Sequence, residues 1–288
     1  MYRFLFLPFA RCMLCLCKGD CPLIIDFHTH IFPDFLASRV LGNLSSYAGH
    51  PPSSNLTMTD TLAKMDEYNI DKSVVLSIAT RIGNQKDTND FAIGLKSERL
   101  LPFGSVHPFA PDATRELDRI KENGLYGIKL HPQYQGFDLS DESVYPVYEH
   151  IDKLGLPVIF HCGYDPLIPS SDAAHSSKII RIKKEFPNLK IVAAHMGGIN
   201  IDEDVESVLI GEDIYIDVSM AMYAFAGKID EYSKLLRSHP IDKILFASDL
   251  PWGNPKTEYD NLMATDLSDD MKERILYKNA LQLLDIKL

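Results

Sequence analysis

Two histidines near the start of the chain, His28 and His30, are spaced so that they could bind one metal ion together. They follow the apolar residues 23–25, a run typical of a β-strand. Side chains of a strand alternate between its two faces, so residues two apart point the same way. Two neutral imidazoles on one face supply half of a tetrahedral metal site.

Three later β-type runs also end in a residue that can bind a metal ion. The run 157–161 ends in His161, 190–195 ends in His195 and 244–249 ends in Asp249. Each histidine taken alone is more often a core or surface residue, but the carboxyl ends of parallel strands meet at one mouth of a barrel. Imidazole and carboxylate suit Zn, or another divalent first-row ion such as Mn or Fe. The recurrence therefore predicts one divalent metal site.

The rest of the chain supplies the elements that would position these residues. Strand-like runs occur at 23–28, 73–79, 101–106, 127–131, 157–161, 191–195, 214–218 and 244–248. Helical periods occur at 57–70, 113–121, 141–154, 179–186, 205–210, 229–236 and 271–284. This alternation is typical of parallel sheets with right-handed crossovers, which either close or are doubly wound.

The position of the candidate ligands favours a closed sheet. A barrel places the first and eighth strands side by side, so that His28, His30 and Asp249 can share an ion, whereas an open sheet need not. We therefore predict an α/β fold, a single (β/α)8 TIM-like barrel with the metal site at its C-terminal face. Residues 23–288 form the expected barrel.

The composition and net charge argue against two classes of partner. The 288 residues are 45% hydrophobic and 24% charged, which fits one large domain, and the formal net charge is −11. Nucleic-acid binding relies on Lys and Arg, so this charge disfavours it. From residue 23 onward no apolar run approaches the roughly 20 residues of a membrane span, which disfavours membrane insertion. We expect a small-molecule substrate, and the sequence leaves open whether the chain forms a homo-oligomer.

Residues 1–22 differ from the rest of the chain. They hold four of the five cysteines (Cys12, Cys15, Cys17 and Cys21), and Arg11 follows an apolar start. The segment fits neither a secretory signal nor a standard metal-binding spacing, so we expect an N-terminal appendix outside the core. The remaining Cys162 should point away from the barrel mouth, because it follows His161 on an alternating strand. No disulfide framework is indicated, which favours the cytoplasm.

Four blocks of the sequence resemble the signatures of the amidohydrolase superfamily: Ile25–His30, Gly127–Pro132, Ala194–Gly198 and Ser248–Trp252. The nearest branch is amidohydrolase family 2, which also contains the relatives of aminocarboxymuconate-semialdehyde decarboxylase. The resemblance covers residues 23–288 in the order found in the family. It is specific for fold and metal and says little about the substrate.

The resemblance implies a role for each residue. His28, His30 and His161 would be metal ligands, with Asp249 as the carboxylate beside the ion. His195 would be a further ligand or, in a mononuclear site, an acid/base and polarising group. Water bound to such an ion has a pKa near ~7, and Asp249 could then carry its proton to a leaving group.

Two reactions fit this site. We favour a metal-dependent hydrolase that uses metal-activated water on a small, carboxylated ester, lactone or amide, because water activation is the default chemistry of the site. The alternative is a non-oxidative decarboxylase of an unsaturated or aromatic acid, in which the ion and His195 manage protonation of carbon. A barrel that only binds a ligand is disfavoured, because the ligands and the proton shuttle are all present.

Lys129 has three open roles. Two-metal relatives carry a carbamylated bridging lysine on the corresponding strand, but the context of Lys129 departs from theirs, so a substrate-facing and a structural role stay open. Asp26 should point into the barrel, where it could pair with Lys129 or brace a histidine. The remaining candidate substrate contacts follow strands or lie beside Asp249: Arg81, His107, His131, His175 and Trp252.

Overall fold

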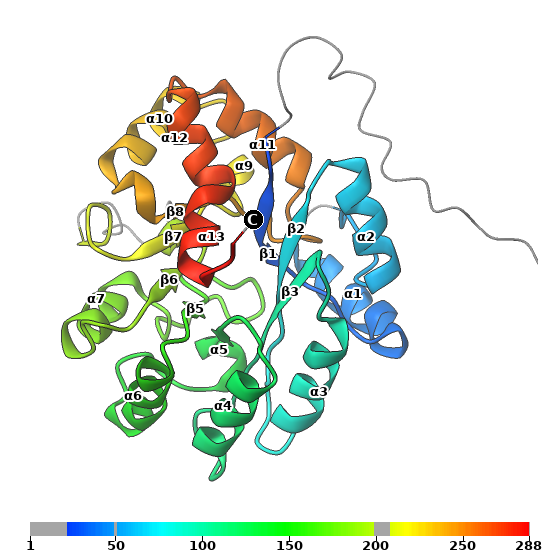
Figure 1. Ribbon diagram of the computed structural model, residues 1–288, viewed down its shortest axis with the longest axis vertical. Coiled ribbons are helices and arrows are strands. Elements are labelled where there is room, and N and C mark those ends of the chain that lie inside the picture. Colours follow the sequence, from blue (N-terminus) through cyan, green and yellow to red (C-terminus); the bar gives the residue numbers. More distant parts are fainter. Residues whose placement is uncertain (1–21, 49–50, 199–207, 288) are drawn as a thin grey trace, which may run out of the picture.

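Eight parallel strands alternate with helices around a central axis in the computed structural model, which describes residues 22–48, 51–198 and 208–287 (Figure 1). The strands are β1 (Ile25–Thr29), β2 (Lys72–Leu76), β3 (Leu100–Phe103), β4 (Ile128–Leu130), β5 (Val158–Phe160), β6 (Ile191–Ala193), β7 (Tyr215–Asp217) and β8 (Ile244–Leu245). Each matches an expected run. The predicted appendix and the start of the expected helix at 205–210 lie outside the described residues.

The strands close into a barrel through two seams. Regular pairing connects β1, β2 and β3 in one sheet and the strands from β4 through β8 in another. Within each sheet, paired strands are consecutive in the sequence. At the first seam the Lys129 amide donates to the Gly104 carbonyl at 2.8 Å. At the second, the Asp249 amide donates to the His28 carbonyl at 2.8 Å. The predicted (β/α)8 barrel is confirmed.

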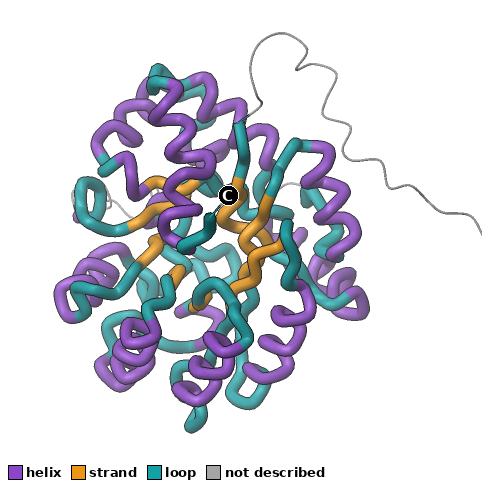
Figure 2. The backbone as a smooth tube through the Cα atoms, in the orientation of Figure 1, coloured by secondary structure: helices purple, strands orange, loops and turns teal. Residues whose placement is uncertain are grey.

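Helices surround the strands (Figure 2). They are α1 (Asp34–Ala48), α2 (Met58–Glu67), α3 (Gln85–Leu95), α4 (Ala113–Glu122), α5 (Pro132–Gln135), α6 (Tyr145–Leu154), α7 (Ser176–Glu185), α9 (Ala221–Ala224), α10 (Ile229–Ser238), α11 (Pro255–Ala264), α12 (Asp269–Glu273) and α13 (Asn279–Leu284). Thr57 caps α2 by accepting the Asp60 amide at 3.2 Å, and Gly155 ends α6 with a φ of 65°.

Two apolar layers form the core because strand side chains alternate. One layer fills the barrel, where Phe27 and Phe103 meet edge to face at 5.7 Å. It is closed at the amino-terminal ends of the strands by Ala280 and Leu283 of α13, which crosses the barrel in Figure 1. The other layer packs the strands against the helices and contains Cys162, which therefore points away from the barrel interior, as predicted.

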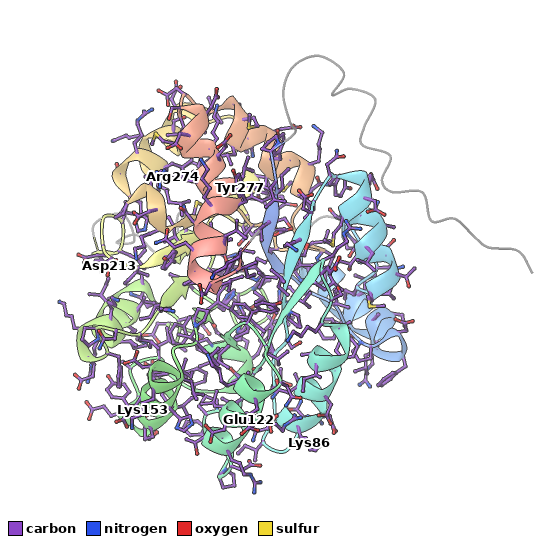
Figure 3. The ribbon with its side chains drawn as sticks, viewed as in Figure 1. Lys86, Glu122, Lys153, Asp213, Arg274 and Tyr277 are labelled. Atoms are coloured by element: carbon purple, nitrogen blue, oxygen red, sulfur yellow. The ribbon has the colours of Figure 1, made fainter. Side chains whose placement is uncertain are left out.

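The outside of the helix ring is charged. Lys86 and Lys153, for example, have side chains that are 68% and 65% exposed, on α3 and α6 respectively (Figure 3). In the described part of the chain, no helix is both long enough and apolar enough to cross a bilayer.

Candidate metal centre

The pairing of β1 with β2 has a register shift between Asp26 and Thr29. The Asp26 carboxylate accepts the amides of Ser248 at 2.9 Å and His28 at 3.1 Å, so it ties β1 to the end of β8. Burial raises the pKa of Asp26 to about 7. The expected pairing with Lys129 is replaced by these bonds, and Asp26 braces the backbone of His28 rather than an imidazole.

Hydrogen bonding fixes the proton of His28. Its Nδ1 lies 2.9 Å from Oδ2 of Asp217, the last residue of β7. Burial alone would raise the pKa of Asp217, but the charge and hydrogen bond of His28 outweigh it and lower the pKa to about 2. An ionised carboxylate can only accept, so the proton is on Nδ1 and Nε2 of His28 carries a lone pair.

His30 has the same tautomer for a different reason. Its Nδ1 lies 3.0 Å from the carbonyl oxygen of Leu76, at the end of β2. A carbonyl oxygen can only accept, so Nδ1 of His30 donates and its Nε2 also carries a lone pair.

Both lone pairs face the same carboxylate oxygen. Oδ1 of Asp249 lies 3.4 Å from Nε2 of His28 and 3.2 Å from Nε2 of His30. Oδ1 is buried without a hydrogen-bond partner in the described structure. Three lone-pair donors converge without a proton between them, which is the donor set that a divalent cation satisfies.

A hydrogen-bonded chain links the next two histidines to Asp217. The hydroxyl of Ser219 donates to Oδ1 of Asp217 and accepts from Nδ1 of His195 at 2.8 Å. Nε2 of His195 then accepts from Nδ1 of His161 at 3.2 Å. This order leaves a lone pair on Nε2 of His161, which is buried and has no hydrogen-bond partner among the described residues.

Of the four expected ligands, three lie in one group and His161 lies in another. The ligand atoms of His28, His30 and Asp249 lie within 4.8 Å of one another, whereas His161 groups with other residues. His195 also groups with His28 and Asp217, but Nδ1 of His28 is already bonded to Asp217 and Nδ1 of His195 to the Ser219 hydroxyl. Both ring nitrogens of His195 take part in hydrogen bonds, and its expected acid/base role stays a prediction.

The profile of the amidohydrolase family (Amidohydro_2) matches residues 25–286. The chain belongs to this family. Its resemblance to the family, stated above from four sequence blocks, is thereby confirmed, and the chain is an enzyme of the amidohydrolase type.

One relative with a known activity matches part of this chain. A 2-amino-3-carboxymuconate-6-semialdehyde decarboxylase of Dictyostelium discoideum is 30% identical over 131 residues, which are 38% of this chain and 36% of the relative. The match thus spans about a third of that relative.

Two solved structures share the fold over most of this chain. An uncharacterized TIM-barrel protein of Bordetella bronchiseptica has a TM-score of 0.72 at 20% identity, covering 91% of this chain and 98% of its own. The 5-carboxyvanillate decarboxylase of Novosphingobium aromaticivorans, complexed with manganese and 4-hydroxy-3-methoxy-5-nitrobenzoic acid, has a TM-score of 0.71 at 17% identity, covering 92% and 96%.

Lys129 lies inside the barrel of this amidohydrolase. It is 1% exposed, and its Nζ has no hydrogen-bond partner in the described structure. Burial lowers its pKa to about 8, and the charges of Asp217 and Asp249 oppose this shift. Lys129 is thus a buried lysine that interacts electrostatically with Asp217 and Asp249, and its role stays a prediction.

The other expected substrate contacts are spread more widely. Trp252 is half-buried, and its amide donates to the carbonyl of Asp249 at 2.7 Å. His107 is buried and accepts the Phe109 amide, while His175 caps α7 by accepting the Ser177 amide. Arg81 has an exposed side chain.

His131 is the remaining expected contact, and it lies against a metal-ligand candidate. Its ring stacks on that of His161, with ring centroids 4.0 Å apart.

Four residues of this region were not identified from the sequence: Tyr134, Asp165, Asp217 and Ser219. The only signal for Asp217 is a carboxylate inside the otherwise apolar run 214–218. Its importance follows from the closed barrel, which brings it to His28 across 189 positions of the sequence.

Proposed function

We propose that this amidohydrolase is a metal-dependent, non-oxidative decarboxylase of a small unsaturated or aromatic carboxylic acid. The observation that carries the proposal is the convergence of the lone pairs of His28 and His30 with the carboxylate of Asp249. His195 lies close by, and its Nδ1 is held by a hydrogen bond to Ser219. The relative from Dictyostelium and the protein from Novosphingobium are both decarboxylases, which supports this reaction over hydrolysis, the reaction that the sequence had favoured.

The ion would be held by His28, His30 and Asp249, with His161 as the fourth ligand. We propose Zn, with Mn or Fe as alternatives, since all three accept nitrogen and oxygen ligands. A bound divalent ion would supply positive charge that polarises an oxygen of the substrate.

The reaction breaks the bond between the carboxylate carbon and its neighbour. Carbon dioxide leaves, and the electron pair stays on the neighbouring carbon, which takes up a proton. We assign this proton transfer to Nε2 of His195. This atom would first take up a proton from solvent, which makes the ring an imidazolium, and would then pass it to the carbon, while Ser219 and Asp217 keep the other ring proton on Nδ1. Asp249 lies on the same side of the mouth, and we assign it a second, proton-carrying role.

Hydrolysis is the second candidate. The observation in its favour is the donor set itself, because two imidazoles and one carboxylate also suit a divalent ion that activates water. The same ligands would then serve an ester, lactone or amide.

The two candidates are separated by their products. The protein loaded with Zn or with Mn is incubated with unsaturated and aromatic carboxylic acids, and in parallel with esters, lactones and amides. We expect metal-dependent release of carbon dioxide from an acid. Release of acid from an ester, lactone or amide, without carbon dioxide from any acid, would overturn the decarboxylase assignment.

Two further proposals concern the chain as a whole. We propose that the catalytic unit spans residues 23–288, so that deleting residues 2–20 leaves its metal content unchanged; loss of bound metal on deletion would contradict this. We also propose a cytoplasmic location, which localisation of a tagged full-length chain would test.

A further inference from the structure

A cavity of about 290 Å³ lies at the opposite end of the barrel from the metal centre. Its lining includes Ile191 and Tyr215, the first residues of β6 and β7, and Lys243, which directly precedes β8. Leu283 of α13, the helix that crosses this end of the barrel in Figure 1, forms another part of the lining. The metal-ligand candidates follow the carboxyl ends of the strands, so the cavity is separate from the proposed active site.

The charged side chains that line this cavity are mainly basic. They are three lysines, Lys183, Lys190 and Lys243, and one carboxylate, Asp213. The lining thus has an excess of two positive charges, three lysines against one aspartate, although the whole chain has a net charge of −11. A concave site lined by one sign of charge attracts ligands of the opposite sign, because its low-dielectric walls focus the field. The cavity therefore favours an anion.

Two of these lysines are enclosed and share the single carboxylate. The side chains of Lys183 and Lys243 are 21% and 23% exposed, whereas those of Lys86 and Lys153 on the outer helices are 68% and 65% exposed. Nζ of Lys243 lies 3.1 Å from Oδ1 of Asp213, and Nζ of Lys183 lies 3.6 Å from its Oδ2. One carboxylate cannot neutralise two ammonium groups, so an enclosed positive charge lacks a counterion among the described residues of the lining.

Backbone carbonyl groups position two of the lysines. Nζ of Lys183 donates to the Pro187 carbonyl at 2.8 Å, and Nζ of Lys190 donates to the Gly155 carbonyl at 3.3 Å. A carbonyl oxygen orients an ammonium group but does not cancel its charge. These bonds therefore hold the two positive charges beside the cavity and leave them available to an anion.

Lys243 is positioned by an aromatic ring. Its Nζ lies 4.5 Å from the centroid of the Tyr215 ring. Burial alone would lower the pKa of Lys243, but its interactions with Asp213 and Tyr215 raise it, so the side chain stays an ammonium ion. Asp242 also acts on this charge, from outside the lining. Lys243 is thus a fixed positive charge on one side of the cavity.

We propose that this cavity is a second binding site, which takes a small dianionic oxyanion such as phosphate or a dicarboxylate. The two excess positive charges of the lining match the charge of a dianion, and its oxygens accept hydrogen bonds from ammonium groups. A volume of about 290 Å³ lies near the lower end of the range for ligand pockets, which favours a small ligand. The proposal does not depend on the reaction at the other end of the barrel.

The test measures anion binding to the full-length, Zn-loaded protein by calorimetry. The buffer is mildly alkaline, so that inorganic phosphate is mostly a dianion, and its ionic strength is fixed. The probes are inorganic phosphate and malonate, with acetate as the singly charged comparison. The variants are Lys183→Gln, which removes an enclosed ammonium group, and Asp213→Asn, which removes the competing carboxylate. The matched control is Lys153→Gln, on the outside of α6.

We expect at least one of the two dianions to bind the wild-type protein more tightly than acetate. Lys183→Gln should weaken this binding about tenfold and Asp213→Asn should tighten it about tenfold, because one charged donor is lost and one like charge is removed. Lys153→Gln should bind like the wild type, and the zinc content of all variants should be unchanged. A gain of affinity in Asp213→Asn cannot result from loss of folding.

Two results would overturn the site. The first is a wild-type protein that binds neither dianion more tightly than acetate. The second is an affinity for the dianion that stays the same in Lys183→Gln or in Asp213→Asn, which would mean that the anion binds elsewhere, for example at the zinc ion. Failure to release carbon dioxide from any acid would reject the decarboxylase and would leave this anion site unaffected.

Discussion

Asp217→Asn should weaken metal binding even though Asp217 is not a ligand. Oδ1 of Asp217 accepts the His195 amide at 3.0 Å, the Ser219 amide at 3.1 Å and the Ser219 hydroxyl. The asparagine should keep its oxygen toward these donors, which places its NH2 group opposite Nδ1 of His28. Two donors cannot bond, so His28 must move its proton to Nε2, where it points at Asp249.

The size of the effect follows from the role of this lone pair. A metal can bind Nε2 of His28 only after the altered tautomer is reversed, with loss of the new hydrogen bond from the asparagine. Changes to residues that orient a metal ligand weaken affinity by about 10- to 100-fold, or about 1.4 to 2.8 kcal/mol. We expect the upper part of this range, because the altered tautomer removes the lone pair of Nε2 itself.

The assay is a competition titration of the metal-free protein with a chromophoric chelator, and circular dichroism checks folding. The matched control is Asp213→Asn, which removes a carboxylate from the outer surface just before β7, where it pairs with Lys243 at 3.1 Å (Figure 3). The control should bind metal like the wild type. A folded Asp217→Asn protein whose affinity is within threefold of the wild type would refute the tautomer argument.

Three more predictions concern single side chains. His195→Asn should lower kcat by about 10² to 10⁴ and retain the metal, whereas loss of metal in proportion to activity would make His195 a ligand. Burial raises the pKa of Glu258 well above its ordinary 4.5, so the folded state holds a proton that the unfolded chain loses, and stability falls as the pH rises above about 4.5. Glu258→Gln should therefore flatten the dependence of Tm on pH and raise Tm at pH 8; parallel curves would contradict this. Gly253→Ala should destabilise by about 3 kcal/mol, because the new Cβ would lie 1.8 Å from the Ser248 carbonyl oxygen, and an unchanged Tm would show that the turn has room.

The sequence predicted the barrel and the site through two periodic rules. His28 and His30 are two apart on a strand, and the other candidate ligands recur at strand ends, which a parallel barrel gathers at one mouth. Both rules depend only on local spacing. They therefore placed His161, His195 and Asp249 after β5, β6 and β8.

Long-range contacts could not be predicted in this way. Asp26 lies two residues before His28 and was expected to share its face, but its carboxylate bonds to the backbone and hydroxyl of Ser248, which lies 222 positions away. Asp217 reads as one polar residue of an apolar strand, and its role depends on His28 from the opposite end of the chain. The helix α11 was also missed, because its signal is only a cap at Asn254 followed by proline.

Arg81 shows that spacing along the sequence does not predict where the side chain of a loop residue lies. It follows β2 as His107 follows β3, and spacing alone predicts that both reach the mouth. The structure leaves the side chain of Arg81 exposed and buries His107. Loop conformation depends on local hydrogen bonds such as the one that the Arg81 amide donates to the side-chain oxygen of Asn84, for which alternating hydrophobicity gives no signal.

The central claim is that His28, His30 and Asp249 hold a divalent ion. The most direct test is elemental analysis of the purified full-length protein and of the His28→Ala, His30→Ala double variant, after equal exposure to Zn or Mn. The account predicts one tightly bound ion per wild-type chain and none in the double variant, while circular dichroism shows that both are folded. An unchanged metal stoichiometry in the folded double variant would contradict it.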